Sequence, residues 1–209
     1  MAALRRYIRP RIEEARCELC RVSLGEPHRH LLELDARKIL CACDACALRF
    51  EGVIGGRFKL VPREIRQLSE IQWSDAEWDS LALPIHLAFI FFSTPAQKIT
   101  ALYPSPAGAT ESLHPLEAWA SLVEKNPRLG DIAPDVEAFL MNRVGDHRDY
   151  FIVPIDRCFE LSGLIRLHWE GLSGGDAVWA QIRNFFDRLK AVAVHVSDIA
   201  ANGGATCPT

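Results

Sequence analysis

The N-terminal part of the chain takes its fold from one stretch: Cys17-Glu-Leu-Cys20, then His28-Arg-His30, then Cys41-Ala-Cys43-Asp-Ala-Cys46. Two cysteines separated by two residues sit in a tight turn, which aims both thiolates at one point and turns backbone N–H groups toward the sulfurs. Two such pairs joined by a hairpin form a zinc ribbon, and the spacing here is slightly longer than usual. Residues 31–34 and 38–41 are the expected hairpin strands, turning at residues 35–37.

More donors are present than one tetrahedral ion needs, so the ligand set has alternatives. The first choice is Cys17, Cys20, Cys43 and Cys46. Cys41 could replace one of the last two, because a Cys-x-Cys pair can also hold a metal. His28 or His30 could complete a site of three cysteines and one histidine, or both could be solvated imidazoles in a polar loop. Zinc is the expected ion, and iron in a rubredoxin-like site is the less favoured one.

The expected role of this ion is structural. A catalytic zinc ion keeps a coordination position open for water, whereas four thiolates close the site and make the ion a poor Lewis acid. Paired CxxC motifs around a His-rich stretch also occur in HNH-type nucleases. Those enzymes need further Asn or His residues after the second pair, where this chain has Ala47-Leu-Arg-Phe50.

Composition and charge describe an ordinary globular protein. Apolar residues make up 49% of the 209 residues, charged residues 24%, and the formal net charge is −3. This charge carries no overall signature of nucleic-acid binding. Residues 1–16 contain five arginines and form a solvated leader, or alternatively an arm for nucleic acid or a membrane surface. The expected divisions are the leader at 1–16, the metal-binding module at 17–50, an α+β domain at 51–195 and a flexible tail at 196–209.

Cysteine usage and the absence of export signals indicate the cytoplasm. Five of the seven cysteines fall between residues 17 and 46, while Cys158 and Cys207 stand alone. Such clustering is typical of metal ligands in a reducing compartment. The N-terminus lacks the apolar segment of a secretory signal, and no apolar run approaches the roughly 18 residues of a membrane span.

Hydrophobic patterns after residue 50 predict the elements of the α+β domain. Residues 85–93 form a continuous apolar run typical of a buried strand, followed by a second strand at 98–103. Ser74 and Glu77 have the spacing of a capping box at a helix start. Further strands are expected at 57–61, 136–144 and 150–154, a helical turn at 63–68, and helices at 116–123, 159–170 and 176–189. This order favours an antiparallel sheet covered by helices on one face.

The segment 103–111 is expected to be a loop, because two prolines and a glycine interrupt it. Its Tyr103, Ser105, Thr110 and Glu111 are candidates for contact with a partner or ligand. The alternative is a rigid connection between two elements.

No complete catalytic constellation is present, so we expect a protein that is not an enzyme. Cys158 follows a predicted strand, and a cysteine at a helix N-terminus can have a lowered pKa. No histidine is placed beside it by the sequence, and a packed cysteine is the simpler interpretation. An enzyme that uses Cys158 or a His-ligated metal is retained as an alternative.

Several segments together resemble an uncharacterised bacterial zinc-ribbon-like family. They are the cysteine and histidine cluster, the segment 103–111, Pro154-Ile-Asp-Arg-Cys158 and Gly171-Leu-Ser-Gly-Gly175. Members of that family are typically encoded beside actinobacterial-type NiFe-hydrogenase genes. The resemblance implies a cytoplasmic accessory role around the hydrogenase, in assembly, maturation or electron-transfer partnering, and it implies no activity.

The leading hypothesis is therefore a zinc-binding accessory protein that docks onto a protein partner, a hydrogenase component. The alternatives are the enzyme above and a nucleic-acid-binding zinc ribbon that uses the Arg-rich leader.

Overall fold

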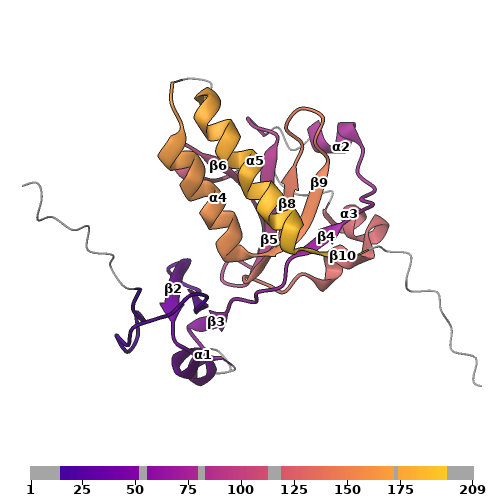
Figure 1. Cartoon of the computed structure of the whole chain (residues 1–209). Helices are drawn as coiled ribbons and strands as arrows, with labels where there is room; N and C mark the ends of the chain where they lie inside the picture. The colour runs from indigo at the N-terminus through magenta and orange to yellow at the C-terminus, as the bar shows by residue number, and fades with distance from the viewer. Residues whose placement is uncertain (1–14, 52–55, 80–82, 113–118, 172–173, 197–209) are drawn as a thin grey trace, which may run out of the picture. The chain divides into compact units, whose positions relative to one another are not determined.

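The computed structural model describes residues 15–51, 56–79, 83–112, 119–171 and 174–196 (Figure 1). The chain divides into two compact units, Met1–Leu60 and Val61–Thr209. Most of the Arg-rich leader, most of the expected tail and Cys207 lie outside the described residues. Within the described residues, no helix combines the length and apolar character needed to cross a membrane.

The described part of the first unit is a small sheet with one helix. Strands β1 (Arg29–Glu33) and β2 (Lys38–Ala42) form the predicted antiparallel hairpin, and helix α1 (Asp44–Phe50) follows β2 directly. Strand β3 (Phe58–Leu60) pairs with the other edge of β1. The core of this unit is small. Its buried cluster is Cys17, Leu31, Leu40 and Ala42, and partly buried side chains, among them Phe50 and Phe58, pack against it.

The described residues of the second unit form a seven-stranded sheet in the order β10-β4-β9-β8-β5-β6-β7. All neighbouring strands are antiparallel except β10 and β4, which run parallel. The strands are β4 (Arg66–Leu68), β5 (Leu87–Ser93), β6 (Lys98–Ser105), β7 (Gly108–Glu111), β8 (Glu137–Asn142), β9 (Asp149–Pro154) and β10 (Val194–Val196). An α+β fold with a largely antiparallel sheet was predicted, and this part of the prediction is confirmed.

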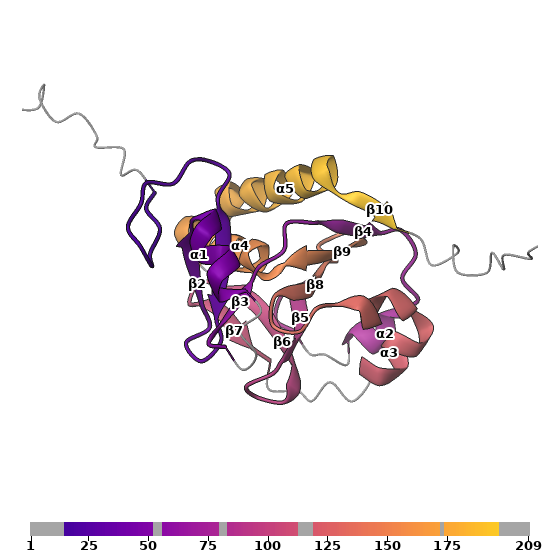
Figure 2. The same ribbon diagram turned by 90° about the horizontal axis from the view of Figure 1, so that it is seen from below.

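Helices cover both faces of this sheet, and not one face as predicted (Figure 2). On one face Phe89 of β5 meets Phe159, and Phe151 of β9 meets Phe186. These partners lie on α4 (Ile155–His168) and α5 (Gly175–Val192). The opposite face packs against α2 (Asp75–Asp79), α3 (Trp119–Lys125) and the 3₁₀ helix η2 (Pro127–Asp131) through their apolar side chains. Central strands buried on both faces read as continuous apolar runs, as residues 85–93 do.

Two local predictions in the second unit are wrong. Residues 66–68 form strand β4 and not part of a helical turn, because they pair with both β9 and β10. The segment 103–111 is a hairpin of β6 and β7 and not an irregular loop. Gly108 adopts φ +109°, which an L side chain rarely adopts, and so allows the tight reversal after Pro106 and Ala107.

The predicted capping box at the start of α2 is confirmed. The Glu77 backbone N–H donates to Ser74 Oγ at 3.2 Å, and the Ser74 backbone N–H donates to the Glu77 carboxylate at 2.9 Å. The Glu77 carboxylate also pairs with Lys125 of α3 at 2.6 Å. These partners, Lys125 foremost, lower the pKa of Glu77 to about 2.

Candidate metal centre

The first CxxC pair lies in a tight turn closed by its own backbone. The Arg21 N–H donates to the carbonyl of Cys17 at 2.8 Å, and the Cys17 N–H donates to the carbonyl of Val22 at 2.9 Å. Arg21 completes the reversal with φ +68°. Cys17 is fully buried and Cys20 is exposed. The turn therefore anchors one sulfur in the core of the unit and holds the second near the surface.

The second CxxC pair forms the beginning of α1. Cys43 is the N-cap residue, and its sulfur accepts a hydrogen bond from the Cys46 N–H at 3.5 Å. This position places the sulfur beside the unpaired N–H groups of the helix N-terminus. The chain thus leaves β2 and enters a helical turn that presents both sulfurs on one side.

Glu18 connects the two pairs. Its backbone N–H donates to the carbonyl of Cys41 at 2.9 Å, and its carboxylate accepts from the Cys41 N–H at 2.8 Å. Lys38 of β2 donates to the same carboxylate at 2.8 Å. The first turn is consequently held against β2, two residues before Cys43.

Cys17, Cys20, Cys43 and Cys46 form the four-cysteine site, because their sulfur atoms all lie within 4.8 Å of one another. The sulfurs of Cys20 and Cys43 are 3.6 Å apart. A tetrahedral zinc ion with Zn–S bonds of about 2.3 Å has S···S edges of about 3.8 Å. The spacing fits such an ion and is far too long for a disulfide, and these four cysteines are free thiols. The four-cysteine site could hold a metal ion such as zinc.

The thiols of Cys17 and Cys46 have pKa values shifted in opposite directions. Burial opposes ionisation of Cys17, but hydrogen bonds from the backbone of Cys20, Cys43 and Leu19 outweigh it and lower its pKa to about 6. Burial and the neighbouring thiols, Cys43 first, raise the pKa of Cys46 to about 12. Thiolates this close oppose one another's charge, and a divalent cation among them removes that opposition.

The remaining predicted donors form a different group. One nitrogen of His28, one nitrogen of His30 and the sulfur of Cys41 lie within 4.8 Å of one another. None of the three belongs to the four-cysteine site. Burial, followed by the carboxylates of Glu18 and Glu26, raises the pKa of Cys41. The structure thus separates the seven sequence candidates into a set of four and a set of three.

The four residues proposed as a partner or ligand contact lie in the hairpin of β6 and β7. The hydroxyls of Ser105 and Thr110 are 2.8 Å apart, and Ser105 Oγ also accepts from the Ala107 N–H at 3.1 Å. Tyr103 and Thr110 are directly paired across the hairpin, and Glu111 pairs with Lys98 at 2.7 Å. The hydroxyls therefore stabilise the hairpin itself.

Cys158 lies on α4 in the core of the second unit with no exposed surface. Burial raises its pKa well above the ordinary value, with a smaller effect from Asp156. A neutral, inaccessible thiol is a poor nucleophile. The arrangement is that of a packed core residue.

We expect Cys158 to resist alkylation by N-ethylmaleimide at neutral pH in the folded protein. Because the reagent can reach Cys158 only after local opening of the structure, the alkylation rate in the folded protein should be at least about 100-fold below the rate in concentrated urea. Site-resolved mass spectrometry measures this, with the exposed Cys20 of chelator-treated protein as the reactive reference. Rapid modification of Cys158 under native conditions would contradict this prediction and revive the enzyme alternative.

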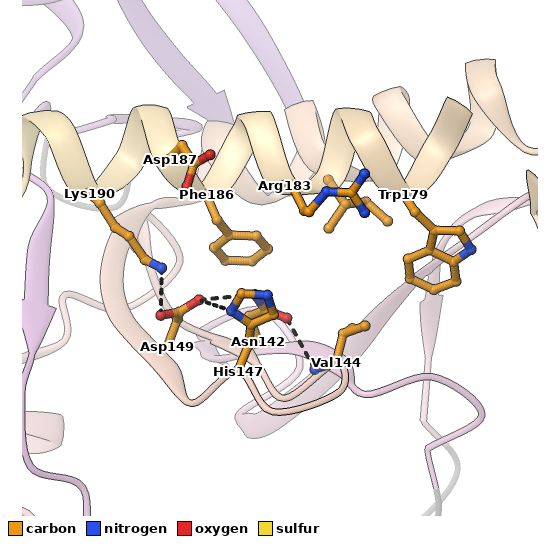
Figure 3. Close-up of a pocket in the computed structure, with 10 residues that line it drawn as sticks. Asn142, Val144, His147, Asp149, Trp179, Arg183, Phe186, Asp187 and Lys190 are labelled. Carbon is orange, nitrogen blue, oxygen red and sulfur yellow. Dashed lines mark hydrogen bonds and ion pairs between the residues drawn. The ribbon is translucent and has the colours of Figure 1, made fainter. Parts of the chain in front are cut away.

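The second unit contains a pocket of about 330 Å³ between the turn from β8 to β9 and helix α5 (Figure 3). Asp149 lies in its floor, where its carboxylate accepts from Lys190 at 2.8 Å and from the Asn142 side chain at 3.1 Å. His147 Nδ1 is 3.7 Å from the same carboxylate, and Trp179 and Arg183 of α5 also line the pocket. Lys190 offsets the charge of this carboxylate, and no cysteine, serine or threonine is among the described lining residues.

Sequence reasoning did not single out Glu18 or the pair of Asp149 and Lys190 in this pocket. Glu18 could have been noticed from its place inside the first CxxC pair, where a side chain reaches the neighbouring strand. Asp149 and Lys190 are 41 positions apart in the sequence, and nothing local relates them.

Comparison with known protein families gives a match over most of the chain. A family profile described as "Family of unknown function (DUF5947)" matches residues 16–193, which cover parts of both units. No curated protein and no solved structure matches the chain. The family description names no activity, ligand or partner.

Proposed function

The chain belongs to the DUF5947 family of unknown function, and on that premise we propose that it is a zinc-binding accessory protein that docks onto another protein. The zinc ion occupies the four-cysteine site and has a structural role. The observation that carries this proposal is the convergence of four sulfur atoms within 4.8 Å at the junction of two CxxC turns.

The chemistry of the donors supports a structural role for this ion. Four thiolates fill a tetrahedral shell and leave no position for water or a substrate. Cys17 lies in the turn that precedes the hairpin in the chain, and Cys43 caps the helix that follows it. An ion between them would join these two segments in a unit whose own apolar core is small.

The proposed partner is a component of a NiFe hydrogenase, in assembly, maturation or electron-transfer partnering in the cytoplasm. Support comes from the sequence resemblance to a family encoded beside such genes. The contact is proposed to include the hairpin of β6 and β7, with Tyr103, Ser105, Thr110 and Glu111. Strand β7 ends the order of the described sheet, and strand edges are common sites of peptide addition.

Elemental analysis with X-ray absorption at the metal edge tests the metal assignment. We expect zinc with a shell of four sulfur neighbours at about 2.3 Å for the four-cysteine site. Replacing Cys20 with Ser should remove that shell, whereas Cys158→Ser should leave it intact. Iron in place of zinc, or no stoichiometric metal, would overturn the assignment.

Affinity purification from the native host tests the partner. We expect a hydrogenase component to be recovered with the wild-type protein and to be depleted with a variant of the exposed hairpin tip, Ala107→Glu. Val192→Glu, which alters an exposed side chain on α5, is the matched control. Recovery of no hydrogenase-linked protein with the wild-type chain would count against the proposal.

A further inference from the structure

The hairpin of the first unit places His30 and Cys41 directly opposite each other on adjacent strands. The next pair, Leu31 and Leu40, is buried in the core of the unit. Successive residues of a strand point to opposite faces, so His30 and Cys41 lie on the face turned away from that core. His28 precedes His30 by two residues, the spacing that returns a side chain to the same face.

Three donor atoms converge on that outer face. The sulfur of Cys41 and one nitrogen from each of His28 and His30 lie within 4.8 Å of one another. The two imidazole rings meet edge to face with centroids 5.0 Å apart. A cross-strand pair plus the residue two positions away gives three ligands on one side of an ion.

His28 provides the clearest indication that this group of donors is a ligand-binding site. Both of its ring nitrogens are buried, and neither forms a hydrogen bond with any of the described residues. Its Nδ1 is 3.3 Å from a carboxylate oxygen of Glu26, close enough for an ion pair but not aligned as a hydrogen bond. Buried polar atoms in native proteins nearly always have a partner, and an imidazole nitrogen facing a thiol and a second imidazole is well placed for a metal ion.

We propose that His28, His30 and Cys41 bind a second divalent transition-metal ion, with zinc as the expected ion, and leave one coordination position open to an exogenous ligand. Cys41 binds as the thiolate and releases its proton. When Nε2 of His28 ligates, the Glu26 carboxylate accepts the hydrogen of Nδ1 and holds the ring, the arrangement common around metal-bound histidines. A mixed shell of two nitrogens and one sulfur with an open position is the type found in catalytic or exchangeable zinc sites.

The open position should face solvent. His30 and Cys41 are half-buried and the His28 side chain is 11% exposed, whereas the neighbouring Glu26 side chain is 79% exposed. A small anion, a thiol or a carboxylate from a partner can therefore reach the ion. This second site uses no ligand of the four-cysteine site. It rests on the proposed function in one respect, because the zinc ion there stabilises the hairpin that carries it.

Cobalt substitution of the full-length protein tests the proposal. We expect wild-type protein to bind two Co²⁺ ions per chain, the tighter one with the intense charge-transfer absorption of four thiolates. Sodium azide should shift the d–d bands of the weaker ion only, because only that ion has an exchangeable position. The double substitution H28N/H30N should abolish binding of the weaker ion and leave binding of the tighter ion unchanged. The matched control, His195→Asn on the exposed strand β10, should bind two ions.

A second variant tests the role of Glu26 as a positioning residue. Glu26→Gln should lower the affinity for the second ion by about 10- to 100-fold and leave the four-thiolate spectrum unchanged. A single Co²⁺ ion in the wild-type protein, with no response to azide, overturns the second site while leaving the first intact. If the wild-type protein with Co²⁺ lacks the charge-transfer absorption of four thiolates, the proposed function is overturned instead. If the H28N/H30N variant loses both ions because it misfolds, the number of Co²⁺ ions bound by the wild-type protein and its response to azide decide whether the second site exists.

Discussion

Withdrawing the metal ion from the four-cysteine site is expected to unfold the first unit and to leave the second unit folded. The described core of the first unit has few buried apolar residues, and a unit of this size rarely folds on apolar burial alone. Structural zinc supplies about 10–16 kcal/mol of apparent binding free energy in comparable small modules, which is more than such a unit's own stability. The second unit has a separate, larger core.

The chain offers a clean way to observe the two units separately. All five tryptophans lie in the second unit, the first of them at Trp73. After treatment with a chelator, amide hydrogen exchange should become fast in β1 and β2, while tryptophan fluorescence should not change. Cys20→Ser should produce the same loss of protection without a chelator. Cys41→Ser, which removes no ligand of the four-cysteine site, is the matched control and should keep the strands protected.

Persistent protection of β1 and β2 in metal-free protein would show that packing alone holds the first unit. Simultaneous loss of the tryptophan signal would show instead that the two units unfold together. Either result would contradict the expected division of stability.

Replacing Phe139 with alanine is expected to destabilise the second unit by about 3–5 kcal/mol. Phe139 lies in the middle of β8 with no exposed surface. Its ring stacks on Trp73 and Tyr150, with centroid distances of 6.1 and 6.0 Å, and lies 6.4 Å from Trp119. Truncation therefore leaves a cavity where the sheet, α3 and the segment before α2 meet, and these neighbours cannot all close it.

Urea unfolding followed by tryptophan fluorescence measures this loss, and the melting temperature should fall by about 10 °C or more. Leu167→Ala is the matched control, because Leu167 on α4 is 76% exposed and its truncation should change stability by less than about 0.5 kcal/mol. The metal content of the first unit should not change in either variant. If Phe139→Ala lowers the free energy of unfolding by less than about 1 kcal/mol, the ring is not packed as described.

The elements predicted correctly are those whose signals are local. A CxxC pair makes a tight turn wherever it occurs, and the capping box of Ser74 and Glu77 needs only four consecutive residues. The apolar run from residue 85 to residue 93 is long enough to indicate a buried strand, and β5 occupies most of it. These features depend on chain geometry within a few residues, which the sequence contains in full.

The wrong local predictions come from pairing across long distances. The strand at residues 66–68 forms because β9 and β10, 81 or more positions later, offer hydrogen-bonding edges on both sides. Its Arg66 also forms an ion pair with the buried Glu137 at 2.8 Å, and no local sequence pattern predicts this interaction. The hairpin of β6 and β7 forms because Gly108 permits the reversal and β6 accepts a partner despite Pro104 and Pro106.

The sequence by itself determined that cysteine turns and a hairpin would build a module whose four thiols could hold a metal ion, and that an α+β domain would follow. It could not divide seven competing donors into two groups. That division depends on which face of the hairpin meets the core, and hence on the register that sets Leu31 against Leu40 and His30 against Cys41. Only the tertiary structure decides such a register, because a shift of one residue would move every side chain of a strand to the other face.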